Sequence, residues 1–161
     1  METTIIVYNN NTGILEVMMP LFQREGYQIQ IVKEKEELQS AVSGEGLRLL
    51  LTDIMMEHST LEEGLEQLRE IRSASKIPMI VVSEEKSEDA KILALNAGAD
   101  DYCNTKCSCE ELLARVKCRL HRYLALSKIC DNIEHIYKVD RLEIDDITRK
   151  VTVEDREVKL T

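Results

Sequence analysis

An apolar run that ends on a single acid decides the fold: LRLLLTD, at residues 47–53. A second apolar run, PMIVVS at residues 78–83, ends on a serine, and a third stretch, ADDYCNTK at residues 99–106, ends on a lysine. Such short runs suit buried strands. They alternate with segments of helical periodicity up to about Leu124, so we predict βαβ units and a parallel sheet.

Five strands and five helices are expected in this part of the chain. The strands are expected at Thr4–Tyr8, Gln28–Val32, Leu47–Thr52, Met79–Val82 and Asp101–Cys103. The helices are expected at Gly13–Glu25, Lys35–Val42, Leu61–Ser73, Ser87–Ala97 and Cys109–Leu126. Capping pairs mark two helix starts, Ser59 with Glu62 and Ser108 with Glu111. Pro20 predicts a kink or a late start in the first helix.

Polar residues of different kinds follow these strands. Ligands and chemistry gather at the carboxyl ends of parallel strands, so Asp53, Ser83 and Lys106 are expected at one edge of the sheet. An acid, a hydroxyl and an ammonium there can form a phosphoryl-accepting pocket, with one nucleophile and two groups that stabilise the transferred charge. The first strand ends on asparagines, at residues 9–11, where a metal-binding acid is expected.

Composition limits the functional class. Of 161 residues, 43% are apolar and 32% charged, which is typical of a soluble globular chain. No apolar run approaches the about 18 residues of a membrane span, and no signal peptide is visible, so we expect a cytoplasmic protein without a membrane partner. A net charge of −9 and a pI near 4.9 disfavour a broad nucleic-acid surface.

The five cysteines indicate neither a zinc site nor a disulfide framework. Cys107-Ser108-Cys109 leaves redox activity open, but reduced thiols are the expectation. After residue 126 we expect a linker at residues 127–135. Three short strands of an antiparallel meander are expected to follow, at 141–145, 150–153 and 157–160.

Four stretches carry a family resemblance. They are LLTDIMM at 50–56, IPMIVVS at 77–83, NAGADDY at 96–102 and EELLARV at 110–116. In this order and spacing, residues 4–124 resemble the receiver domain of a two-component response regulator. The tail from Val139 is similar to the first strands of a winged-helix output domain of the OmpR/PhoB type, and the chain is expected to be truncated before that domain's helices.

The resemblance implies an α/β, flavodoxin-like fold. Five parallel strands in the order 2-1-3-4-5 would be flanked by five helices, with a small antiparallel β segment at the C-terminus. The receiver would span residues 1–126, the linker 127–135 and the start of the truncated winged-helix domain 136–161.

The resemblance also implies roles for individual residues. Asp53 would be the phosphoacceptor. Ser83 would bind the phosphoryl group, Tyr102 would turn inward behind it as a switch, and Lys106 or Thr105 would assist. Mg²⁺ would be held by Asp53, Asn9, Asn10 and the Met55 carbonyl. A face for symmetric dimerisation would comprise Lys91, Asp100, Asp101, Glu111, Arg115, Lys117, Arg119 and Arg122.

Three departures from the family pattern surround this pocket. Asn9 and Asn10 replace an acidic pair, so Mg²⁺ binding should be weak or absent. Thr105 occupies the lysine position, and Lys106 takes the place of the following proline. The segment at residues 57–64 is longer than usual and lacks a proline.

Two functional interpretations follow. In the first, the chain is a transcription-controlling response regulator that takes phosphate from a sensor histidine kinase and dimerises, with DNA bound only through the missing C-terminal helices. In the second, it is a pseudo-receiver that dimerises and regulates without phosphorylation, an idea that overlaps with a purely structural dimerisation module. Enzyme classes fit poorly. A haloacid dehalogenase-type phosphatase needs an acid where Met55 stands, and Asn11-Thr12-Gly13 is no nucleotide-binding loop.

Overall fold

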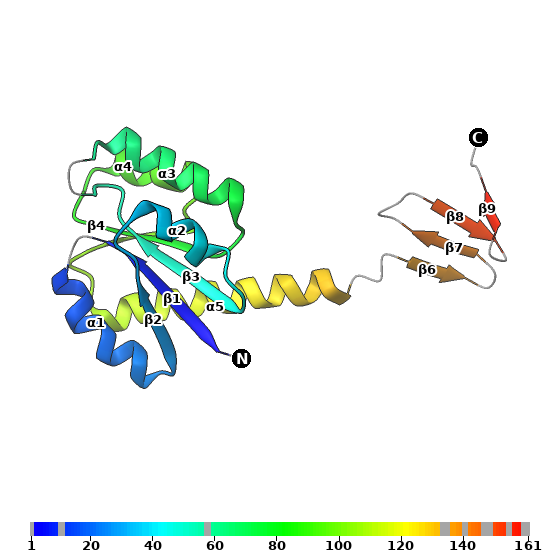
Figure 1. Cartoon of the computed structure of the whole chain (residues 1–161), viewed down its shortest axis with the longest axis horizontal. Coiled ribbons are helices and arrows are strands. Elements are labelled where there is room, and N and C mark those ends of the chain that lie inside the picture. Colours follow the sequence, from blue (N-terminus) through cyan, green and yellow to red (C-terminus); the bar gives the residue numbers. More distant parts are fainter. Residues whose placement is uncertain are drawn as a thin grey trace. The chain divides into compact units, whose positions relative to one another are not determined.

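The computed structural model describes residues 2–9, 12–56, 59–132, 136–139, 142–145, 150–153 and 156–158. The chain divides into two units, residues 1–123 and 124–161 (Figure 1). The first unit contains, in chain order, β1 (Thr3–Tyr8), α1 (Thr12–Arg24), β2 (Tyr27–Ile31), α2 (Lys35–Val42), β3 (Leu47–Thr52), α3 (Leu61–Ala74), β4 (Met79–Ser83), α4 (Glu88–Asn96) and β5 (Asp101–Asn104). It also contains the first part of α5 (Cys109–Asn132).

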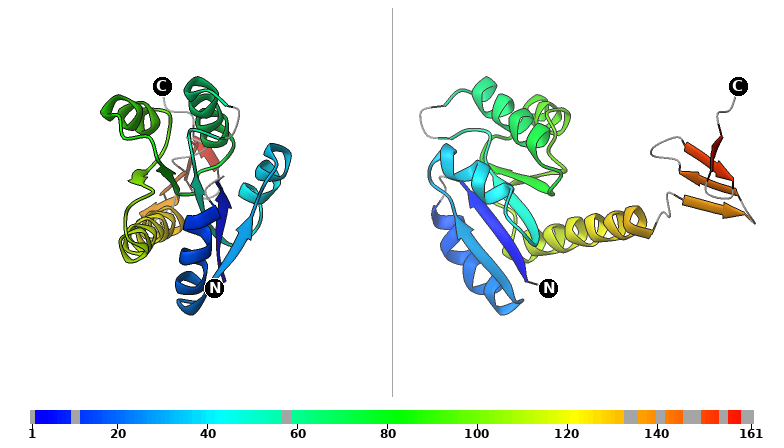
Figure 2. Two further views of the ribbon diagram at one scale, coloured as in Figure 1. Left: turned by 90° about the vertical axis from the view of Figure 1, so that its left-hand side faces the viewer. Right: turned by 45° about the vertical axis from the view of Figure 1, so that its right-hand side comes forward.

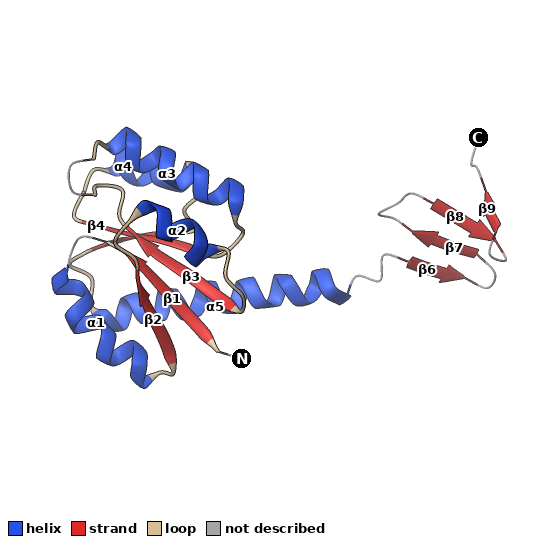
Figure 3. Ribbon diagram, in the orientation of Figure 1, coloured by secondary structure: helices blue, strands red, loops and turns tan. Residues whose placement is uncertain are grey.

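The first unit is built on one parallel sheet in the order β2-β1-β3-β4-β5. The arrows of β1 and β3 run side by side in the same direction (Figure 3). Every residue of β4 is buried, as are the last four residues of β1 and of β3. Strands that are covered on both faces are apolar without alternation, which is why the sequence shows continuous runs. The predicted strand order and α/β class are confirmed.

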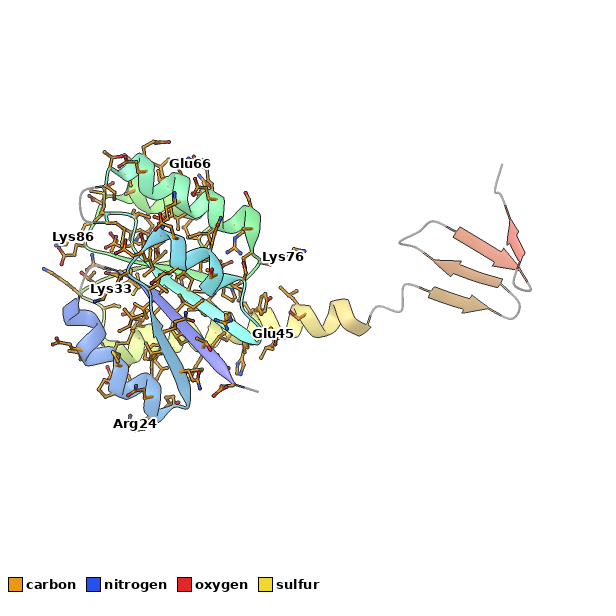
Figure 4. All side chains as sticks on the ribbon, in the orientation of Figure 1. Arg24, Lys33, Glu45, Glu66, Lys76 and Lys86 are labelled. Carbon is orange, nitrogen blue, oxygen red and sulfur yellow. The ribbon has the colours of Figure 1, made fainter. Side chains whose placement is uncertain are left out.

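Helices cover both faces of the sheet. Figure 2 shows α2, α3 and α4 on one face and α1 with the first part of α5 on the other. On the first face, α2 contributes Leu38, Ala41 and Val42 to the core. α4 packs through small residues, Ala90 and Ala94. Charged side chains such as Arg24, Glu66 and Lys86 point outward into solvent (Figure 4).

The capping residue of α3 and the start of α1 differ from the prediction. α3 is capped by Thr60 and not by Ser59: Glu63 N–H donates to Thr60 Oγ1 (3.3 Å), and Thr60 N–H donates to a Glu63 carboxylate oxygen (2.6 Å). Ser59 Oγ instead donates to Met56 O (2.9 Å). α1 begins at Thr12 and includes Pro20, so of the two expected alternatives, a kink or a late start, the late start is wrong. The Ser108 cap of α5 is confirmed, because Glu111 N–H donates to Ser108 Oγ (3.1 Å).

Gly64 lets α3 approach the segment that follows β3. A Cβ at this position would overlap the backbone carbonyl of Ile54. Gly64, Leu65 and Leu68 are the buried residues of the first part of α3. A glycine inside a helix normally costs about 1 kcal/mol relative to alanine, so close packing explains its presence here.

Arg72 of α3 ties together the connections at the amino-terminal edge of the sheet. Its guanidinium donates to Gly98 O (2.9 and 3.0 Å), Ile77 O (2.9 Å) and Ser75 O (3.3 Å), and it pairs with Asp100 (2.7 Å). Asp100 also accepts from Met79 N–H (2.7 Å). One side chain therefore holds the chain before β4 to the chain before β5.

The segment after residue 126 differs from the prediction. α5 continues to Asn132, so the expected linker at 127–135 is helical as far as that residue. The second unit holds four antiparallel strands and not three, in the order β6-β7-β8-β9. They are β6 (Ile136–Val139), β7 (Leu142–Asp145), β8 (Lys150–Val153) and β9 (Arg156–Val158). Among the described residues, no helix has the length and apolarity that a membrane span requires.

Candidate functional site

The carboxyl ends of four strands meet at one edge of the sheet. Tyr8 pairs with Thr52 in the parallel register, so the next residues, Asn9 and Asp53, leave the sheet side by side. Ser83, the last residue of β4, pairs with Asn104, the last residue of β5. Thr52 also pairs with Val81 of β4, so Asp53 and Ser83 lie at the same edge, and the predicted convergence of an acid and a hydroxyl follows from this register.

Asp53 is a buried carboxylate, 7% exposed. Its Oδ1 accepts a hydrogen bond from Met55 N–H (3.0 Å). Burial raises the pKa of Asp53 above its ordinary value. Hydrogen bonds from the Ser83 hydroxyl and from the Met55 and Ile54 amides oppose that rise, and the nearby Glu84 carboxylate adds to it. The acid is thus held in place by hydrogen-bond donors.

Ser83 links Asp53 to Tyr102. The serine is fully buried, and its Oγ accepts from Glu85 N–H (3.3 Å). Tyr102 is 8% exposed, and its hydroxyl donates to Glu85 O (2.7 Å). Burial raises the pKa of Tyr102, while a hydrogen bond with Ser83 lowers it. The ring therefore lies inward, within hydrogen-bonding reach of Ser83.

The turn after β5 carries the two residues expected to assist the pocket. Thr105 N–H donates to Ser83 O (3.1 Å), which fixes the start of the turn to the end of β4. Lys106 is exposed, and its own N–H donates to Asn104 Oδ1 (2.9 Å). The structure thus brings the Thr105 backbone to Ser83 and leaves the Lys106 side chain at the surface.

The expected magnesium ligands are only partly described. Asn9 Nδ2 donates to Val82 O (2.9 Å), so this amide ties the end of β1 to β4. Asn10 lies outside the described residues, and Met55 is 43% exposed. Within the described ranges, no cluster of three or more His, Cys, Asp or Glu side chains could hold a metal. Of the expected ligands, those in the described part of the chain are the Asp53 carboxylate, the Asn9 amide oxygen and the Met55 carbonyl.

The residues expected on a dimer face do not all point the same way. Arg115 pairs with Asp101 (3.1 Å) and Glu111 (2.8 Å), and Arg119 lies 3.4 Å from Asp101. Lys91 is exposed on α4, with its Nζ 5.9 Å from the centre of the Tyr102 ring, and Arg122 is exposed on α5. The remaining two residues of the expected dimer face pair with other parts of the unit. Asp100 pairs with Arg72 of α3, and Lys117 pairs with Glu25, which follows α1.

Sequence reasoning missed two residues at this edge. Glu84 influences Asp53 through its charge, and its position directly after Ser83 was the available signal. Asn104 holds the turn after β5, because its Oδ1 accepts from Lys106 N–H and its carbonyl from Cys107 N–H (2.9 Å each). Asparagine commonly bonds the backbone two residues ahead, which was a usable turn signal.

The sequence and the structure were compared with known protein families and solved structures. A family model described as "Response regulator receiver domain" matches residues 5–117. A response regulator from Thermotoga maritima is 25% identical with a TM-score of 0.64, and the match covers 75% of this chain and 99% of that chain. A CheY-like receiver domain protein from Methanospirillum hungatei is 26% identical with a TM-score of 0.64, covering 76% and 95%. DrrB, an OmpR/PhoB homolog from Thermotoga maritima, matches 100% of this chain and 68% of that chain at 22% identity and a TM-score of 0.63, a likeness of fold.

Proposed function

Because the chain belongs to the response regulator receiver domain family, we propose that it is a phosphorylation-dependent switch of a two-component system, with Asp53 as the phosphoacceptor. The observation that supports this most is that the buried Asp53 carboxylate and the fully buried Ser83 hydroxyl lie close together at the carboxyl edge of the sheet, so that Ser83 lowers the pKa of the acid. A nucleophile and a donor for a phosphoryl oxygen are then side by side.

The proposed reaction is transfer from a phosphohistidine of a sensor kinase. An Asp53 carboxylate oxygen attacks phosphorus; the O–P bond forms while the N–P bond of the phosphohistidine breaks, and the histidine nitrogen keeps the electron pair. Met55 N–H orients the carboxylate, and Ser83 donates to a phosphoryl oxygen. Positioning and charge stabilisation supply most of the catalysis in phosphoryl transfer.

The donors present fit a weak Mg²⁺ site. Mg²⁺ is usually held by one or two carboxylates together with phosphate oxygens and waters. Asp53 supplies the one carboxylate, and the Met55 carbonyl and the Asn9 amide oxygen are the proposed neutral donors. When bound, the ion would neutralise phosphoryl charge. The Asn9 amide, which also bonds Val82 O, keeps the ends of β1 and β4 together.

We propose that phosphorylation changes the position of Ser83, then that of Tyr102, and finally the surface formed by α4, β5 and α5. Movement of Ser83 toward a phosphoryl group would change its contact with Glu85, whose carbonyl accepts from the Tyr102 hydroxyl. We propose that Lys91, Asp101, Glu111, Arg115, Arg119 and Arg122 then form a symmetric dimer contact. Charges of both signs on one surface suit pairing with a second copy.

A role in transcription is proposed for the whole protein. The β6–β9 meander and the match to DrrB over the whole chain support an output domain of the OmpR/PhoB type. DNA would then be bound by that output domain. Dimerisation would set the spacing between two such domains.

Intact mass spectrometry tests the proposal. The chain is incubated with a small phosphodonor and Mg²⁺, and one phosphoryl adduct is expected on the parent and on Asp89→Ala, a control at an exposed acid of α4. Asp53→Ala should show none. Size exclusion of the same samples should show a larger species only with the donor. An unmodified parent that is already dimeric would instead support the pseudo-receiver.

A further inference from the structure

Two cysteines face each other beside the proposed switch. Cys103 lies on β5 and Cys107 in the turn that follows, and their sulfur atoms are 2.6 Å apart. Both are free thiols. The turn brings them together, because Cys107 N–H donates to Asn104 O (2.9 Å). A disulfide bond is about 2.05 Å long, so little movement separates the dithiol from a cross-link.

We propose that Cys103 and Cys107 form a reversible disulfide with a hydroperoxide as oxidant. The Cys107 sulfur attacks the peroxide oxygen, the O–O bond breaks, and a sulfenic acid and one water result. The Cys103 sulfur then attacks the sulfenic sulfur, and the S–S bond forms as a second water leaves. Two thiols have lost two electrons and two protons, and hydrogen peroxide has become two waters. A dithiol reductant reverses the reaction by exchange.

The difference in exposure indicates which cysteine reacts with the peroxide and which then forms the disulfide. Cys107 is half-buried and lines a surface cavity of about 400 Å³, to which the more deeply buried Cys103 also contributes. Cys103 is 2% exposed, and burial together with the adjacent Cys107 sulfur raises its pKa to about 12. A small oxidant therefore reaches Cys107 first, and Cys103 resolves the sulfenic acid from within.

The cross-link would act on the proposed phosphorylation site, and this consequence rests on the proposed function. The turn holds Thr105, bonded to Ser83 O, and Lys106, whose side chain is exposed. For the Lys106 side chain to leave the surface and approach Asp53, we expect the turn to move with it. A bond between residues 103 and 107 closes the turn in its present form, so oxidation should slow phosphorylation of Asp53.

The chemistry is tested on the full chain. The reduced protein is treated with one equivalent of hydrogen peroxide and alkylated, and free thiols are counted by intact mass. The parent should fall from five free thiols to three (5 − 2), and Cys118→Ser, an exposed site on α5, from four to two. Cys107→Ser should form no such pair. Peptide mapping should place the bond between Cys103 and Cys107; a Cys107–Cys109 bond, a bond between chains, or five surviving thiols would overturn the proposal.

A second measurement separates the regulatory consequence from the proposed function. Phosphodonor labelling of the oxidised parent should be slower than that of the reduced parent, on the order of tenfold, because misplacement of positioning groups can cost up to two orders of magnitude. Cys107→Ser should label at the same rate with and without peroxide. Equal rates for both forms of the parent would refute the coupling. A reduced parent that does not label at all would refute the proposed function, while the thiol count still decides the disulfide.

Discussion

Asp53 is buried from water, and this burial disfavours the charged form of its carboxyl group. Hydrogen bonds from Ser83 and the backbone offset this effect only in part, so the pKa of Asp53 remains raised. A carboxyl whose folded-state pKa is raised binds protons more tightly in the folded state. Its contribution to stability is present below the unfolded pKa and is lost as the pH rises through the folded pKa.

Asp53→Asn should therefore raise the melting temperature at pH 7 by a few degrees, measured with a metal chelator present. The gain should shrink as the pH falls toward 3.8, the ordinary pKa of the carboxyl. Glu45→Gln, at an exposed carboxylate, should change little at either pH. A lower melting temperature for Asp53→Asn at pH 7 would contradict the assigned burial.

Asn9→Asp should have two opposed effects. Without metal, the new carboxylate loses the hydrogen bond to Val82 O, so the free energy of unfolding should fall by about 1–3 kcal/mol. With Mg²⁺, a second carboxylate beside Asp53 should raise the metal affinity and restore stability. Thermal melts with and without Mg²⁺ measure both effects.

The control for that prediction is Gln23→Glu, which adds the same charge near the C-terminal end of α1, at the opposite edge of the sheet. It should leave Mg²⁺ affinity unchanged. If Mg²⁺ fails to stabilise Asn9→Asp, then residue 9 does not face the proposed metal position.

At the proposed site, the sequence predicted that Asp53 and Ser83 lie close together, but not the position of the Lys106 side chain or the hydrogen bonds of the site. Asp53 and Ser83 follow from strand ends in a parallel sheet, a purely topological argument. The exposed side chain of Lys106 and the Cys103–Cys107 contact depend on the turn geometry set by Asn104. No periodicity reports that geometry, since it arises from side-chain to backbone hydrogen bonds within a few residues.

Among the elements, α3 offers two possible caps in its sequence. Both Ser59 and Thr60 have a glutamate three residues ahead. The Ser59 hydroxyl is bonded to Met56 O, whereas the Thr60 hydroxyl accepts from Glu63 N–H, and this distinguishes the two. Hydrogen bonds of the preceding segment thus decide between caps that the sequence pattern leaves equivalent.

Gly64→Ala should destabilise the protein although alanine favours helices. The added methyl group overlaps a backbone carbonyl that cannot swing away, so we expect a loss of about 1–3 kcal/mol in the free energy of unfolding. Urea unfolding measures it. Gly44→Ala is the matched control, because a Cβ there meets only the movable end of the Arg48 side chain. Equal effects of the two changes would remove the packing argument.

For the molecule as a whole, the five-stranded sheet was predictable because buried parallel strands leave continuous apolar runs between helical segments. The second unit was harder. β6 is four residues long and begins where the expected linker ends, and α5 continues to Asn132 without a break in helical residues. The formation of short strands and the position of helix ends depend on contacts with other parts of the fold, and these contacts cannot be read from the local sequence.

The first unit should be stable by itself. A fragment of residues 1–126 retains the five-stranded sheet and its covering helices. Its last residue, Leu126, is 63% exposed, so the cut does not pass through the core. We expect its thermal midpoint, followed by circular dichroism, to equal that of the corresponding transition in the full chain. A midpoint clearly lower in the fragment would show that residues 127–161 support the sheet.

The guanidinium of Arg72 has a consequence for recombination between related proteins. Its acceptors are spread from Ser75 to Asp100, on connections that precede two different strands. A chimaera with a crossover between positions 72 and 100 would inherit the donor from one parent and some of the acceptors from the other. Shuffled libraries of such domains should therefore keep this interval as one inherited block.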